Sequence, residues 1–109
     1  MGRPNLRIRR EIGKIRQRGQ IFRGRWVHVR MGISEQDRTL ISVRKKFGNA
    51  VLRNRIRRQV RAVCAELIPS GHPQRLLLIS VGDHAHGVSF SQLRLELQSA
   101  FQKFGLIPT

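Results

Sequence analysis

Few side chains in this sequence of 109 residues could carry chemistry. It contains six aspartates and glutamates, four histidines and one cysteine, Cys64. No arrangement of serine, histidine and acid typical of a nucleophilic site stands out, and six acids are few for metal-assisted hydrolysis. We therefore predict that the chain has no catalytic residue of its own and holds no metal ion.

Two histidines and the cysteine need separate consideration. His84 and His86 lie two residues apart between Gly82 and Gly87. Protein zinc sites use three or four ligands, and no third ligand accompanies this pair, so a metal site here is poorly supported. A single cysteine excludes an internal disulfide and a cysteine-based zinc knuckle. We expect Cys64 to be a small, buried packing residue.

Phosphate binding is the chemistry that the sequence favours. Its 22 lysines and arginines give a formal net charge of +16. Residues 1–61 carry all of this charge, residues 62–109 are neutral, and no acid occurs between Thr39 and Ala65. Such self-repulsion destabilises a compact state unless an anionic partner relieves it. We expect that partner to be a nucleic acid, and we expect the chain to bind neither a membrane nor a small-molecule substrate.

Length and apolar content define the class of protein. A chain of 109 residues suits one domain, and a hydrophobic fraction of 39% together with ten glycines is typical of globular proteins. No apolar run approaches the length of a membrane span, and the basic N-terminus lacks the apolar stretch of a signal peptide. We predict a soluble, cytoplasmic protein with a single domain, residues 1–109.

Much of the charge falls on one helix, predicted to begin after Asn49 and to end at Ile68. At about 100° per residue, its apolar residues form one stripe and its arginines the neighbouring arc, with Arg53 at the border and Arg55 apart. No glutamate three or four residues away offsets the repulsion between arginines, so nucleic-acid binding is favoured over a merely solvated face. The planar guanidinium also binds phosphate with two hydrogen bonds. The predicted core stripe comprises Leu52, Ile56, Val60, Val63, Cys64 and Leu67, and the arc comprises Asn54, Arg57, Arg58 and Arg61.

The spacing of apolar residues predicts the elements that position this helix. Residues 6–18 have helical spacing, and residues 75–81 are almost continuously apolar, which is typical of a strand buried on both faces. Ser89 and Gln92 have the spacing of a capping box, which opens a last helix. The predicted order is α-β-β-α-β-α, with room for one more short strand that the sequence does not place. This order implies an α+β fold with helices on a small sheet. The three predicted strands are residues 26–33, 39–43 and 75–81.

The first of these strands separates two kinds of side chain. Its odd positions are apolar and predicted to face the core, whereas Trp26, His28 and Arg30 occupy even positions on the other side. Trp26 is consistent both with a base-stacking residue and with a packing residue that covers an edge of the sheet.

Eighteen consecutive residues, from Arg44 to Arg61, resemble a known signature. They read RKKFGNAVLRNRIRRQVR, similar to the Lys-Lys-hydrophobic-Gly-x-Ala-Val segment, Arg-Asn-Arg motif and further basic pair of the protein subunit of bacterial ribonuclease P. The resemblance extends in outline over the whole chain. It implies a two-layer α/β sandwich like the second domain of ribosomal protein S5. It also implies a left-handed β-α-β crossover through strands 39–43 and 75–81, against the usual right-handed rule.

The resemblance also implies a function. Ribonuclease P is an endoribonuclease that removes the 5′ leader from precursor tRNA by hydrolysing one phosphodiester. The RNA subunit with bound Mg²⁺ performs this reaction, while the protein binds that RNA and the leader. By position, the residues expected to contact the RNA subunit are Arg44, Lys45, Lys46, Arg53, Asn54, Arg55, Arg57, Arg58 and Arg61. Those expected at the leader cleft are Ile12, Arg16, Phe22, Trp26, His28 and Arg30.

This sequence departs from the family at several of these positions. The residues matching Ile12 and Arg16 are usually aromatic in the family, and the one matching Arg30 often is. Arg44 replaces a common serine. We therefore expect the cleft to hold leader phosphates more than to stack bases. A ribosomal, rRNA-binding protein is the main alternative, because small size, high positive charge and an S5-like fold are expected there too.

Overall fold

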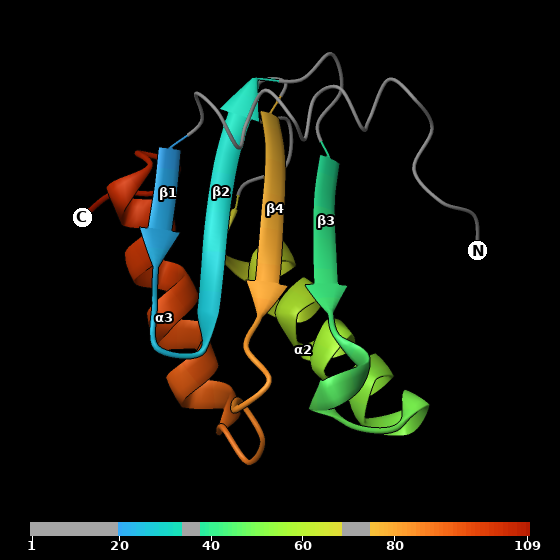
Figure 1. Ribbon diagram of the computed structural model, residues 1–109. Helices are drawn as coiled ribbons and strands as arrows, with labels where there is room; N and C mark the ends of the chain where they lie inside the picture. Colours follow the sequence, from blue (N-terminus) through green and yellow to red (C-terminus); the bar gives the residue numbers. More distant parts are fainter. Residues whose placement is uncertain (1–19, 34–37, 69–74) are drawn as a thin grey trace.

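The computed structural model describes residues 20–33, 38–68 and 75–109. In this part of the chain a four-stranded sheet carries two α-helices on one face (Figure 1). The predicted first helix, residues 6–18, lies outside the described residues. None of the helices described is both long and apolar enough to cross a membrane. The elements are β1 (Gln20–Arg23), β2 (Val27–Ile33), β3 (Arg38–Val43), the 3₁₀ helix η1 (Lys45–Phe47), α2 (Ala50–Leu67), β4 (Arg75–Val81) and α3 (Phe90–Lys103).

The mixed α+β fold predicted from the sequence is confirmed. The strands are ordered β1-β2-β4-β3, so the most apolar strand, β4, lies between two others. β2 pairs antiparallel with both β1 and β4, whereas β3 and β4 are parallel. The short strand that the sequence did not place is β1, which forms a hairpin with β2.

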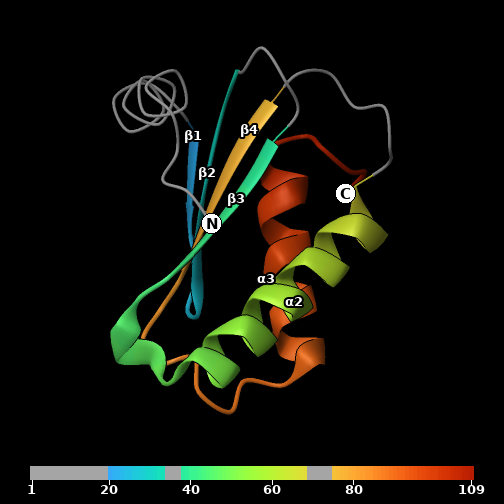
Figure 2. The same ribbon diagram turned by 90° about the vertical axis from the view of Figure 1, so that its right-hand side faces the viewer.

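The β3–α2–β4 connection is left-handed, as the family resemblance implied. In Figure 1 both strands run downward with β3 to the right of β4. Figure 2 shows both helices on one side of the sheet, the side that lies behind it in Figure 1. A parallel crossover is right-handed in about 98% of cases, so this connection is an exception.

The core lies between the sheet and the two helices. Val27 and Val29 of β2 and Ile79 of β4 are fully buried there, as alternation predicts for a strand with one face on the helices. From α3, Phe101 is the largest fully buried side chain. Of the stripe predicted on α2, Ile56, Val60 and Val63 are buried, while Cys64 and Leu67 pack against the core from a half-buried position.

One residue of that stripe is not in the core. Leu52 is 37% exposed, because the first turn of α2 lies beyond the ends of β3 and β4 (Figure 1). Both helix starts agree with the sequence: Asn49 accepts a hydrogen bond from the Leu52 N–H at 3.0 Å, and Ser89 and Gln92 form the capping box. The predicted starts of both helices are therefore confirmed, whereas the prediction that Leu52 lies in the core is wrong.

Burial of Cys64 leads to a prediction about pH. Burial raises the pKa of its thiol from 9.0 to about 11, because desolvation penalises the thiolate. Between these two values the thiol ionises in the unfolded chain but not in the folded protein, which favours unfolding. We expect the free energy of unfolding, measured by urea denaturation, to fall over this range. The fall should be shallower in Cys64→Ala, and equal slopes in the two proteins would contradict the prediction.

Candidate nucleic-acid interface

Most of the residues expected to contact RNA lie on one side of α2 and around η1. We call Arg44, Lys45, Lys46, Arg53, Asn54, Arg57, Arg58 and Arg61 the basic surface. Arg53 and Arg57 are half-buried and the others exposed. The exposure follows from helical periodicity, because these positions flank the stripe that packs on the sheet.

The chain before α2 is shaped so that its lysines stay exposed. Phe47 is buried (4% exposed) and anchors η1 to the core, whereas Lys45 and Lys46 point away from it. Gly48 joins η1 to the helix at φ +157°, and a Cβ there would lie 2.8 Å from Cδ1 of Leu52. Only glycine fits this link without a shift of Leu52. Gly48 of the signature thus fixes the backbone conformation that leads from Lys45 and Lys46 into α2.

Of the acids in the described part of the chain, Asp83 contacts the basic surface, whereas Glu66 and Glu96 are paired elsewhere. Asp83 forms an ion pair with Arg44 at 3.5 Å. Glu66, near the end of α2, accepts from Arg94 of α3 at 2.9 Å. Within the surface, Arg57 donates to the Asn54 side chain at 3.3 Å, so a neutral amide orients one guanidinium. The arrangement presents charge that a polyanion can neutralise.

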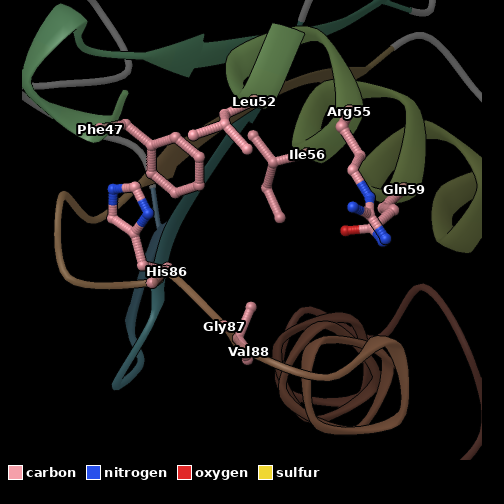
Figure 3. A pocket seen from close by; sticks show the side chains of 9 residues that line it. Phe47, Leu52, Arg55, Ile56, Gln59, His86, Gly87 and Val88 are labelled. Carbon is pink, nitrogen blue, oxygen red and sulfur yellow. The ribbon is translucent and has the colours of Figure 1, made fainter. Parts of the chain in front are cut away.

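Arg55 is separated from the basic surface, as the helical spacing predicted. It lies on the other flank of α2, together with Gln59, beside the loop between β4 and α3 (Figure 3). The two histidines of that loop do not come together. His84 donates from Nε2 to the carbonyl of Arg25, while His86 stacks on the Phe47 ring.

A second basic area lies on the face of the sheet opposite the helices. Strand register places His28 beside Arg23 of β1, and the next open position of β2 holds Arg30. Arg38 of β3 lies on the same face, beside Leu76. We call Arg23, His28, Arg30 and Arg38 the open-face group. Arg23 and Arg38 were not assigned to this group from the sequence, because which residues of neighbouring strands lie side by side depends on the strand register. The alternation of side chains within residues 38–43 was a signal that could have indicated the face of Arg38.

The structure does not bring all the predicted leader-binding residues together. Phe22 pairs in register with the buried Val29 and therefore faces the helices. Trp26 also packs against the core and borders a hollow with Phe22 and Leu95 of α3. The placement of Trp26 beside His28 was wrong, because Trp26 lies in the turn before β2, where strand alternation does not apply. Ile12 and Arg16 lie outside the described residues.

The turn that holds Trp26 is fastened by one carboxylate of α3, Glu96. The backbone N–H groups of Arg25, Trp26 and Val27 all donate to it, the last two at 2.9 Å. Gly24 lies against the same carboxylate, where a Cβ would be 2.5 Å from Cδ of Glu96. This acid therefore connects the β1–β2 hairpin to α3.

Replacing Glu96 should measurably destabilise the protein. Glu96→Gln keeps the shape but removes the negative charge, and hydrogen bonds to charged groups contribute about 1.5–3 kcal/mol. We expect a loss of that size in the free energy of unfolding, measured by urea denaturation. Glu66→Gln is the matched control, because its exposed ion pair with Arg94 should contribute less than about 1 kcal/mol. Equal losses in the two variants would show that Glu96 does not fasten the turn.

A sequence profile of the Ribonuclease P family matches residues 2–105 of the chain. The chain belongs to the Ribonuclease P family. The match includes the basic surface, the sheet and α3, so both areas described above are features of a member of this family. The ribosomal alternative is set aside by this assignment.

Curated members of the family are similar over most of this chain. The ribonuclease P protein component of Thermus scotoductus is 35% identical over 104 residues, which cover 94% of this chain and 61% of that protein. That of Thermus oshimai is 37% identical over 95 residues, covering 86% and 60%. That of Bacillus pumilus is 33% identical over 107 residues, covering 93% and 87%. The chain thus spans about 60% of the length of the two Thermus relatives.

Solved structures of the family share the fold. A Staphylococcus aureus ribonuclease P protein, a mutant with defective mRNA degradation activity, superposes with a TM-score of 0.77 at 24% identity, covering 91% of this chain and 86% of that one. The Thermotoga maritima protein gives 0.72 at 24% identity, covering 93% and 97%.

Proposed function

We propose that this chain is the protein subunit of a cytoplasmic ribonuclease P, an enzyme that removes the 5′ leader from precursor tRNA. In this proposal the basic surface binds the RNA subunit and the open-face group binds the leader. The observation that carries the proposal is the basic surface itself. It comprises seven cationic side chains and one amide on and before α2, and of the described acids Asp83 is the one that pairs with it. Membership of the Ribonuclease P family supports the ribonuclease P RNA as the RNA that this surface binds.

The basic surface suits a folded RNA because it is mostly arginine. A guanidinium can donate two parallel hydrogen bonds to one phosphate and can stack on a base, whereas lysine acts as a point charge. Asn54 adds an amide that already accepts from Arg57. A helix with arginines on successive turns can follow neighbouring phosphates along one strand of the RNA.

The open-face group suits a single-stranded leader. Arg23, Arg30 and Arg38 supply positive charge on three strands, and the exposed Ser80 lies beside His28 in the register. Phe22 and Trp26 face the helices, so the aromatic side chains proposed for stacking are not on this face. We infer that the leader is held through its phosphates, which makes the contact tolerant of leader sequence.

We assign the hydrolysis to the RNA subunit and its Mg²⁺. The carboxylates of the described residues lie on separate elements and form no cluster: Asp83 in the β4–α3 loop pairs through Oδ2 with Arg44, Glu66 of α2 pairs with Arg94, and Glu96 of α3 accepts from backbone N–H groups. Mg²⁺ is bound through oxygen ligands such as free carboxylates. These residues do not fit an Mg²⁺ site, so the metal belongs to the RNA in this proposal.

Reconstitution tests the proposal. The purified protein alone should leave precursor tRNA intact in any divalent metal. Added to ribonuclease P RNA at an Mg²⁺ concentration too low for the RNA alone, it should restore cleavage at the end of the leader. Cleavage by RNA-free protein would contradict the assignment of the chemistry, and failure to stimulate the RNA would contradict the proposed function.

A further inference from the structure

A groove of about 280 Å³ opens beside the first turns of α2, and none of its lining residues belongs to the basic surface or to the open-face group. Its floor and walls come from η1, α2 and the loop between β4 and α3 (Figure 3). The lining residues are Phe47, Leu52, Arg55, Ile56, Gln59, Ala85, His86, Gly87 and Val88.

The groove has an aromatic side and a polar side. The rings of Phe47 and His86 are stacked, with centroids 4.5 Å apart and planes inclined by 14°. Figure 3 shows this pair on one side of the groove and the side chains of Arg55 and Gln59 on the other, with Ile56 between them. None of the lining residues that the structure describes is acidic.

The shape of the groove is preformed by several contacts. The Arg44–Asp83 ion pair and the Phe47–His86 stack both connect the loop to the chain around η1. Gly48 allows His86 to come close, since a Cβ on Gly48 would lie 3.3 Å from Cε1 of His86. Two turn hydrogen bonds within the loop, from Ala85 to Gly82 and from Val88 to Ala85, hold its backbone.

These walls match the chemistry of a nucleobase. A base needs an apolar or aromatic surface for its face and hydrogen-bonding groups for its edge. The Gln59 amide both donates and accepts, and the Arg55 guanidinium donates, as in known contacts to base edges. The volume lies just below the roughly 300–1,000 Å³ of small-molecule sites, which suits one base.

We propose that this groove binds one unpaired nucleobase of the ribonuclease P RNA subunit. The inference rests on the proposed function. Arg55 then contacts RNA on the flank of α2 opposite the basic surface, so the RNA wraps the N-terminal half of the helix from two sides. The absence of acids from the described lining favours an RNA over an acidic peptide. The leader is excluded as the occupant because its proposed site lies on the other side of the sheet.

The test is the affinity of two groove variants for the RNA subunit, measured by filter binding over a series of salt concentrations. Gln59→Ala should weaken binding about 2- to 12-fold through one lost hydrogen bond. His86→Ala should weaken it about 5- to 150-fold through lost stacking. Gln98→Ala on α3 is the matched control, since it is also a half-buried helical glutamine but lies outside the groove. Urea denaturation shows whether His86→Ala still folds.

The salt dependence of binding distinguishes a contact to a nucleobase from a contact to a phosphate. Gln59 carries no charge, so its loss should shift the affinity without changing the slope of log K against log salt, whereas Arg57→Ala should reduce the slope by about one. If Gln59→Ala and His86→Ala bind like Gln98→Ala while Arg57→Ala binds weakly, the groove proposal is overturned and the proposed function stands. If the unmodified protein does not bind the RNA, both are overturned.

Discussion

Replacing Arg57 and Arg58 together with alanine should weaken binding to the ribonuclease P RNA by about two orders of magnitude or more. Each removes a charge-assisted contact of about 1.5–3 kcal/mol, and each tenfold in affinity corresponds to about 1.4 kcal/mol. Neither side chain belongs to the buried stripe of α2. The double variant should therefore fold normally, with each substitution changing stability by about 0.5 kcal/mol or less.

Salt dependence and a charge control make this result specific. If about six to eight basic residues reach phosphates, log K should fall with log salt at a slope of roughly −4 to −7. The double variant should have a slope about two units shallower. Arg57→Ala and Arg58→Ala are also measured singly, and Arg94→Ala is the control for each of them. It likewise removes one positive charge, but from α3, where Arg94 pairs with Glu66. An equal effect of Arg94→Ala would show that net charge alone drives binding.

The second large effect distinguishes Arg30 from Trp26, which the sequence analysis placed on the same side of one strand. Arg30→Ala should leave binding of the RNA subunit unchanged and weaken binding of precursor tRNA with a long leader, by about 1.5–3 kcal/mol. Trp26→Ala should instead lower the free energy of unfolding by about 3 kcal/mol, near the lower end for a lost core aromatic because its ring is half-buried. The stability of Trp26→Ala is measured by urea denaturation.

A substrate trimmed to a single leader nucleotide is the control for Arg30. Against it, the Arg30→Ala holoenzyme should bind as tightly as the unmodified one, since the phosphates that the open-face group would contact are missing. Equal loss of affinity for the long and the trimmed leader would refute a leader site on the open face. If Trp26→Ala is stable and binds only long-leader substrates more weakly, Trp26 belongs to the leader site, as expected from the sequence.

Local patterns predicted most of the described elements. The Asn49 cap and the Ser89–Gln92 capping box both depend on residues three positions apart, and both form. The apolar run at residues 75–81 predicted a strand buried on both faces, and Leu76 and Leu78 on one face of β4 are buried, as are Leu77, Ile79 and Val81 on the other. Short-range hydrogen bonds and the helical and strand periods require no knowledge of distant neighbours, so sequence spacing is sufficient for them.

The sequence missed what depends on pairing between distant segments. β1 is only four residues long and becomes a strand by pairing with β2. Trp26 falls into an alternating pattern, yet its backbone bonds to Glu96, seventy residues away in the chain. Leu52 has the spacing of a core residue, but it is exposed, because the first turn of α2 lies beyond the ends of the strands.

The signature at residues 44–61 thus indicated the family, and composition and helical spacing predicted the charged helix and the partner class that its arginines favour, because all three are properties of the local sequence. The tertiary structure determined on which face of the sheet or helix each side chain lies. Strand register put Arg23 beside the predicted His28, placed Arg38 on the same face across β4 from Arg30, and turned Phe22 toward the helices. The meeting of η1, α2 and the β4–α3 loop created the groove around Arg55. These placements depend on packing between segments far apart in the chain, which no local spacing encodes.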